Sequence, residues 1–154
     1  MQVWLPAWGR WVHADPCENA LDAPRMYERG WGKRLSYVFA FGRAGGVDVA
    51  PRYAVDWTAC AARRDWVAEG WLELTLASMN ATVQSTLSAE ARAVAEARAA
   101  AESEELQRLR RSTAGPHSAS SAVPVAEGGD LQAEQRGRQT GSVEWREARG
   151  ELGK

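Results

Sequence analysis

A histidine, two carboxylates and a thiol lie close together in residues 10–24, RWVHADPCENALDAP: His13, Asp15, Cys17 and Glu18. A cysteine nucleophile needs a base within hydrogen-bond reach, and that base needs a group that orients it. His13 and Asp15 alternate on an expected strand, so they point to the same face with their Cα atoms roughly 7 Å apart. Cys17 lies beyond the end of that strand, and side chains of one strand seldom converge head to head. A self-contained Cys17–His13–Asp15 site is therefore disfavoured, and Cys17 is expected to be a small buried apolar side chain.

The same residues do not have the spacing of a metal site. Structural zinc sites use paired ligands with CxxC or HxxxH spacing and a second pair downstream. The chain has two cysteines and two histidines. Cys60 has no neighbouring ligand, and His117 falls in a segment expected to be a linker. We predict no metal site in this chain.

Composition excludes several classes of function. A length of 154 residues corresponds to one domain. The net charge of −1 provides no basic stripe, so a nucleic-acid partner is not expected. No apolar run approaches the ~18 residues of a membrane span. Two cysteines without a dense framework fit a reducing compartment.

The elements that must position the reactive residues are expected to be short strands. Residues 2–14 alternate loosely and predict strand, turn at 6–9, strand. LSYVFAFG (35–42) is rich in β-forming residues, and the Gly45-Gly46 pair is expected to turn the chain back into VDVAPRY, residues 47–53.

The second half is expected to be helical and then disordered. From about Arg63, apolar residues recur at three- and four-residue steps, which predicts a helix. It continues into an exposed Ala/Glu/Arg-rich stretch supported by pairs such as Arg98 with Glu102. A small, polar, proline-containing linker follows. The predicted units are a core region over residues 1–85, the helix 86–111, the disordered linker 112–135 and a short C-terminal segment 136–154.

The order of several motifs resembles a known family. The matching residues are Arg10-Trp11, His13, Asp15-Pro16-Cys17-Glu18, Pro24, Tyr27-Glu28, Gly30-Trp31, Lys33, Leu35-Ser36-Tyr37, Val47-Asp48-Val49 and Arg52-Tyr53. Together they resemble the segment of cytosolic peptide:N-glycanases that carries a catalytic aspartate, the C-terminal part of their core. The resemblance covers roughly residues 2–83 and 136–153.

The resemblance implies both a fold and an activity. The fold would be α+β: a portion of a transglutaminase-like core of the papain-like superfamily, with antiparallel strands followed by a long helix and a disordered linker. The family uses a Cys–His–Asp triad to hydrolyse the amide between N-acetylglucosamine and asparagine in misfolded glycoproteins. The implied partners are misfolded N-glycoproteins and proteasome-linked shuttle proteins, and the implied location is the cytoplasm.

Three residues match functional positions of that family. Asp15 matches the triad aspartate, which would orient the imidazole and stabilise the imidazolium. Trp11 and Glu18 match positions that line the substrate cleft, where an indole can face a sugar and a carboxylate can accept from hydroxyl groups. The plainer alternatives stay open: Trp11 as core, Glu18 as a surface charge or cap, and Asp15 as a turn residue.

The departures from the family pattern bear on activity. The family's nucleophilic cysteine and its zinc-binding CxxC motifs lie upstream of the matching segment, and its triad histidine would fall just before Met1. We therefore expect a fragment, or a form that has lost the chemistry, with no cofactor site and no activity alone. Whether the chain is an enzyme stays open, and the alternative is a non-catalytic module that binds glycoproteins or other partners.

Overall fold

The structure, a computed structural model, describes residues 1–114. Its elements are β1 (Gln2–Leu5), a 3-10 turn (Pro6–Trp8), β2 (Arg10–Asp15), β3 (Ala20–Leu21), α1 (Met26–Arg29), β4 (Phe39–Gly42), β5 (Gly45–Asp48), α2 (Ala50–Tyr53), α3 (Trp57–Ala61), α4 (Glu69–Gln84) and α5 (Ala89–Ser112). Apart from the first residues of the linker, the predicted segments 112–135 and 136–154 lie outside the described residues.

The N-terminal sheet has three antiparallel strands in the order β1-β2-β3. Trp4 of β1 lies opposite Trp11 of β2, and Asp15 pairs with Ala20 at the end of β2. The turn between β1 and β2 closes through Gly9, whose φ of 60° is a left-handed conformation that suits glycine. The strand–turn–strand predicted for residues 2–14 is confirmed.

A second sheet is the β4–β5 hairpin, in which Phe39 pairs with Asp48. The strand predicted from residue 35 begins only at Phe39, and the return segment is short. The expectation that VDVAPRY is extended throughout is wrong, because its last residues form α2. Pro51 is compatible with helix here because the first turn of a helix has no hydrogen bond for its missing N–H to make.

The predicted helix is divided in two. α4 begins at Glu69 rather than near residue 63. After a short break, α5 begins at Ala89, and Ser88 is its N-cap, because the Ser88 side chain accepts from the Ala91 N–H. α4 packs on β5, and Leu72 is its buried residue, whereas Trp71 and Leu74 are 62 % and 72 % exposed.

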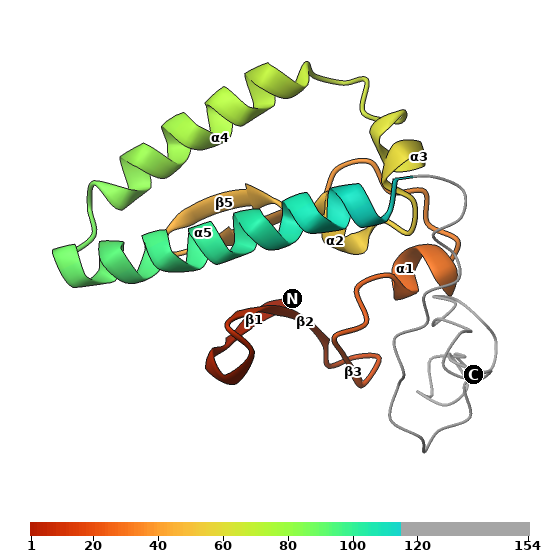
Figure 1. The fold of residues 1–154 in the computed structure, drawn as a ribbon, viewed down its shortest axis with the longest axis horizontal. Helices are drawn as coiled ribbons and strands as arrows, with labels where there is room; N and C mark the ends of the chain where they lie inside the picture. Colours follow the sequence, from red (N-terminus) through yellow and green to blue (C-terminus); the bar gives the residue numbers. More distant parts are fainter. Residues whose placement is uncertain (115–154) are drawn as a thin grey trace, which may run out of the picture.

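α5 is docked, in contrast to the exposed helix expected from its composition. Figure 1 shows α4 and α5 as an antiparallel pair, with both helices on the same side of the turn that joins them. α5 contacts both α2 and β2, and it buries Glu102 and Leu106. The predicted Arg98–Glu102 pair is replaced by a pair between Glu102 and Arg52 of α2.

The core gathers around α2. One cluster joins Val49 and Tyr53 to Leu106 of α5, and a second joins Ala50 and Ala54 to Cys60 of α3. The described chain is thus a mixed α and β structure with two small antiparallel sheets and several helices. None of the helices within residues 1–114 is long and apolar enough to cross a membrane.

Candidate functional site

The carboxylate of Asp15 lies at the end of β2, where the strand enters a tight loop. Its Oδ1 accepts from the backbone N–H groups of Cys17 at 3.0 Å and Glu18 at 3.3 Å. Its Oδ2 accepts from the hydroxyl of Tyr27 in α1 at 2.8 Å. These contacts fix the side chain in one orientation while Asp15 stays partly exposed.

The same tyrosine hydroxyl contacts His13. The His13 Nε2 lies 2.9 Å from the Tyr27 oxygen. Because the single hydroxyl proton is donated to Asp15, Tyr27 accepts from an N–H on His13 Nε2. His13 and Asp15, which alternate on β2, are therefore joined through one hydroxyl group rather than directly.

The His13 ring is buried, with 1 % of the residue exposed. Its Nδ1 has no hydrogen-bond partner among the described residues. Burial, followed by the positive charge of the N-terminal amine, holds the pKa of His13 below its usual 6.5. A proton on Nδ1 would be a buried donor without an acceptor, so the neutral ring is favoured.

An aromatic cluster holds Tyr27 in place. Its ring meets Trp31 edge-on with centroids 5.2 Å apart, and it meets the His13 ring edge-on at 5.5 Å. Tyr53 of α2 packs against both His13 and Tyr27, and its hydroxyl accepts from Gln2 at 3.2 Å. β1, β2, α1 and α2 thus jointly set the position of the Tyr27 hydroxyl.

The hydrogen bonds to Asp15 favour its ionised form. The bond from Tyr27 is the largest cause that lowers the pKa of Asp15, and the two backbone N–H groups add to it. A carboxylate has about four acceptor sites, two on each oxygen. Three are filled by Tyr27, Cys17 and Glu18, which leaves one on Oδ2 for a further donor.

Cys17 is not buried as the sequence predicted. It is exposed in the loop after Asp15, so the expectation of a small buried side chain is wrong; the buried cysteine is Cys60. The loop follows Pro16 and turns back at Asn19, whose φ is 49°, and this turn carries Cys17 to the surface. His13 directs one nitrogen to Tyr27 and leaves the other without a partner, so the described geometry provides no Cys17–His13 pair.

Metal ligands do not gather in the described region of the chain. Residues 1–114 contain no group of three or more His, Cys, Asp or Glu side chains that could hold a metal ion. Residues 1–114 therefore offer no ligand set for a zinc ion.

Trp11 and Glu18 lie on either side of Asp15 in the sequence. The Trp11 ring meets Trp4 edge-on at 5.7 Å, and the Arg98 guanidinium of α5 lies 5.9 Å from its centroid. Trp11 is partly buried by these contacts. Glu18 is partly exposed in the loop, and its backbone N–H supports Asp15.

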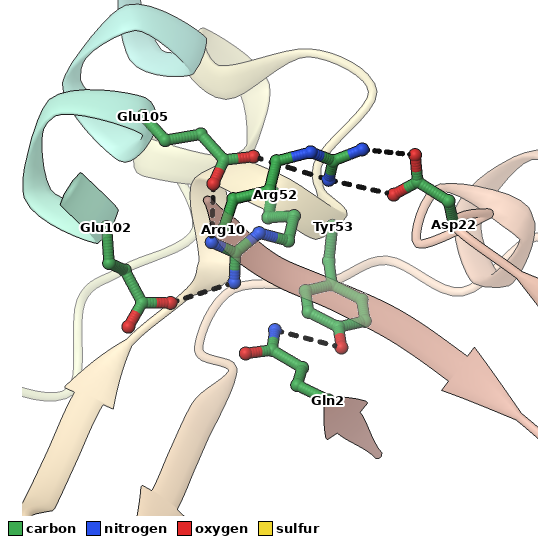
Figure 2. A network of polar contacts seen from close by, with 7 residues as sticks. All are labelled: Gln2, Arg10, Asp22, Arg52, Tyr53, Glu102 and Glu105. Carbon is green, nitrogen blue, oxygen red and sulfur yellow. Dashed lines mark hydrogen bonds and ion pairs between the residues drawn. The ribbon is translucent and has the colours of Figure 1, made fainter. Parts of the chain in front are cut away.

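A network of ion pairs fixes β2 to the helices (Figure 2). Arg10 of β2 makes two hydrogen bonds with Asp22, at 3.0 Å and 2.5 Å, and lies 3.7 Å from Glu105 of α5. Arg52 of α2 pairs with Glu102 at 2.9 Å and with Glu105 at 3.1 Å. The strand that carries Asp15 is thereby tied to its following loop, to α2 and to α5.

Tyr27 is the site residue that sequence reasoning missed. It belongs to the Pro24, Tyr27-Glu28 motif, to which the sequence assigned no role. The signal was present in the spacing: a tyrosine shortly after a turn that reverses β2 can reach back to the end of that strand. Only the folded chain reveals that its hydroxyl bridges His13 and Asp15.

Comparisons with known proteins identify relatives of this chain. No model of a known protein family matches it. Peptide-N(4)-(N-acetyl-beta-glucosaminyl)asparagine amidases from Homo sapiens and Arabidopsis thaliana are 39 % and 36 % identical to it, over 99 % and 94 % of the chain. The Caenorhabditis elegans protein of that name is 36 % identical over 99 %. The chain spans only 20 %, 18 % and 23 % of these three relatives. Over nearly its whole length, therefore, the chain is homologous to a segment that makes up about one fifth of peptide-N(4)-(N-acetyl-beta-glucosaminyl)asparagine amidases.

Proposed function

We propose that this chain is the portion of a peptide:N-glycanase that supplies the aspartate of a Cys–His–Asp triad. The whole enzyme would hydrolyse the amide between N-acetylglucosamine and asparagine in misfolded glycoproteins. The cysteine and the histidine would come from protein outside this chain, so the chain alone would not act. Its strands would be the C-terminal part of a transglutaminase-like core working in the cytoplasm.

The observation that carries the proposal is the state of the Asp15 carboxylate. It is ionised, held by three hydrogen bonds, partly exposed, and has one acceptor site left on Oδ2. A triad aspartate needs these properties, because it accepts one imidazole N–H, fixes the tautomer and stabilises the imidazolium without taking the proton.

The neighbours of Asp15 would contact substrate. Glu18 is partly exposed one turn beyond Asp15 and would accept hydrogen bonds from sugar hydroxyl or peptide N–H groups. Trp11, which is partly exposed, would offer its indole to the apolar face of a sugar. Proteasome-linked shuttle proteins would be further partners of the whole enzyme.

The test is release of glycan from a denatured glycoprotein. We expect none from the 154-residue chain alone, because a thiolate paired with an imidazole is needed to begin the reaction. We expect weak release when the remainder of the human relative is supplied as a separate chain and a complex forms. Release by the isolated chain that disappears in Cys17→Ala would instead support a local site around Cys17.

A second candidate, a non-catalytic binding module, is favoured by one surface. Tyr37, Phe39 and Phe41 lie in a row with neighbouring ring centroids 6.2 Å apart, and Trp66 lies 6.1 Å from Tyr37. Phe41 and Trp66 are 70 % and 88 % exposed. Exposed aromatic rows of this kind are typical of binding surfaces. Retention of a denatured glycoprotein by the chain, lost in Trp66→Ala and without turnover in any complex, would favour this function.

A further inference from the structure

We propose that Tyr27 is a positioning residue for Asp15 and that His13 holds Tyr27 in the donating orientation. The proposal rests on the assignment of Asp15 to the triad. The three side chains form one directed series, from His13 Nε2–H to the Tyr27 oxygen at 2.9 Å and from the Tyr27 O–H to Asp15 Oδ2 at 2.8 Å.

The direction of these hydrogen bonds follows from which groups carry a proton to donate. An ionised carboxylate only accepts, so Tyr27 must donate to Asp15 and must accept from His13. Reversal would need a proton on the carboxylate and also the neutral histidine tautomer that carries its proton on Nδ1. The hydrogen bonds around Asp15 oppose the first, and the burial of Nδ1 without a partner among the described residues opposes the second.

Tyr27 itself stays a donor. Burial and the hydrogen bond to Asp15 raise the pKa of its hydroxyl well above the usual 10.0. Its ring is held between Trp31 and Tyr53, so the hydroxyl keeps a fixed place. The other charged or titratable groups that act on this cluster are the N-terminal amine, Glu18, Asp22 and Tyr53.

This arrangement has a consequence for a triad. The acceptor site left on Asp15 is on Oδ2, the same oxygen that Tyr27 contacts. Tyr27 therefore selects the direction from which an imidazole N–H can approach. It also stabilises the negative charge on that oxygen, so the proton stays on the imidazole when an imidazolium forms.

The decisive experiment is a carbon NMR titration of the Asp15 carboxyl in the 154-residue chain. Tyr27→Phe removes the donor and keeps the ring, so we expect the proton affinity of Asp15 to rise about tenfold, which is one pKa unit. Tyr53→Phe is the matched control, because its hydroxyl lies in the same cluster but accepts from Gln2. An unchanged Asp15 pKa in Tyr27→Phe would overturn the proposal.

A second substitution protects the test against loss of the fold. A ring-fluorinated tyrosine at position 27 has nearly the same shape but a more acidic hydroxyl, and a more acidic donor strengthens the bond to a carboxylate. We expect the Asp15 pKa to fall below that of the unmodified chain. No change, or a rise, would count against Tyr27 as the donor.

The positioning role of Tyr27 and the assignment of Asp15 to the triad can fail separately. Turnover, measured in a complex of this chain with the remainder of a relative, distinguishes the two. If Asp15→Asn leaves turnover unchanged, the triad assignment fails, whereas the NMR titration still decides the role of Tyr27. If Asp15→Asn abolishes turnover and Tyr27→Phe alters neither the Asp15 pKa nor the acid limb of the pH profile, the positioning role fails. We expect Tyr27→Phe to move that acid limb to higher pH and to lower kcat more than it changes KM.

Discussion

The guanidinium of Arg52 donates to the carboxylates of Glu102 at 2.9 Å and Glu105 at 3.1 Å, inside the contact between α2 and α5. The side chains of Arg52 and Glu102 are 2 % and 6 % exposed. The buried residues of α5, a helix with few large apolar side chains, are Glu102 of this ion pair and Leu106. Because Arg10 also contacts Glu105, the same contact fixes the strand that carries Asp15.

Removal of Glu102 from this ion pair should therefore weaken the packing of α5. We expect Glu102→Ala to lower the free energy of unfolding by about 3 kcal/mol, near the lower end for a broken buried pair, because Glu105 still compensates Arg52. Glu104→Ala, on the exposed side of α5, should change it by less than about 0.5 kcal/mol. Urea unfolding checks both values, and equal effects would contradict the buried pairing.

Two side chains of α4 bind the β4–β5 hairpin: Gln84 donates to the Ala44 carbonyl at 3.1 Å, and Asn80 makes two bonds to Gly46. The Asn80 amide accepts from the Gly46 N–H at 2.7 Å and donates to the Gly46 carbonyl at 2.9 Å. We expect Asn80→Ala to cost about 1–3 kcal/mol, because it leaves the buried Gly46 N–H and C=O without partners. Ser78→Ala, exposed on the same helix, is the matched control, and thermal unfolding is the measurement.

Stability should fall in mild acid because of His13. Its pKa is lower in the folded chain than the usual 6.5, so between these two values the unfolded chain binds more protons. Stability from this group is complete above 6.5 and is lost as the pH falls through the folded pKa. In urea unfolding at a series of pH values, wild type should lose more stability than His13→Gln across that window. Parallel curves would show that His13 does not resist protonation.

The two thiols should react very differently. Cys17 is exposed, whereas Cys60 is buried, its Sγ lies 3.6 Å from the Ser36 carbonyl, and burial raises its pKa. We expect an alkylating reagent to label Cys17 rapidly in the native chain and Cys60 only after denaturation, as read by mass spectrometry. Rapid labelling of Cys60 would place α3 away from the core.

Local pattern was enough to predict the short antiparallel strands. The alternation in residues 2–14 and the Pro6–Gly9 turn indicated β1 and β2, and the β-rich stretch before Gly45 indicated the hairpin. Asp15 could be named as a candidate from the sequence because the motif around it is contiguous, and its role in a triad stays a prediction. Each of these signals needs only neighbours within a few residues.

What the sequence could not provide are contacts between distant residues. Arg52 and Glu102 are 50 positions apart, so their pairing turned an apparently exposed helix into a docked one. The apolar character of the Cys17 side chain predicted burial. Its exposure depends instead on how the loop after β2 turns. Tyr27 acquires a role only because α1 folds back over the end of β2.

The sharpest test of the site itself is Asp15→Asn in an active complex with the remainder of a relative. An amide offers the wrong partner to an imidazole N–H, and in a serine-protease triad the equivalent change lowers turnover about 10⁴-fold. We expect a loss of that order in kcat, measured as glycan release from a denatured glycoprotein. Glu18→Gln should mainly raise KM, and Asp65→Asn, an exposed aspartate in the segment before α4, should change neither value. A complex that keeps its rate with Asp15→Asn would show that Asp15 is not the third member of the triad, even though Tyr27 and two backbone N–H groups hold its carboxylate in place.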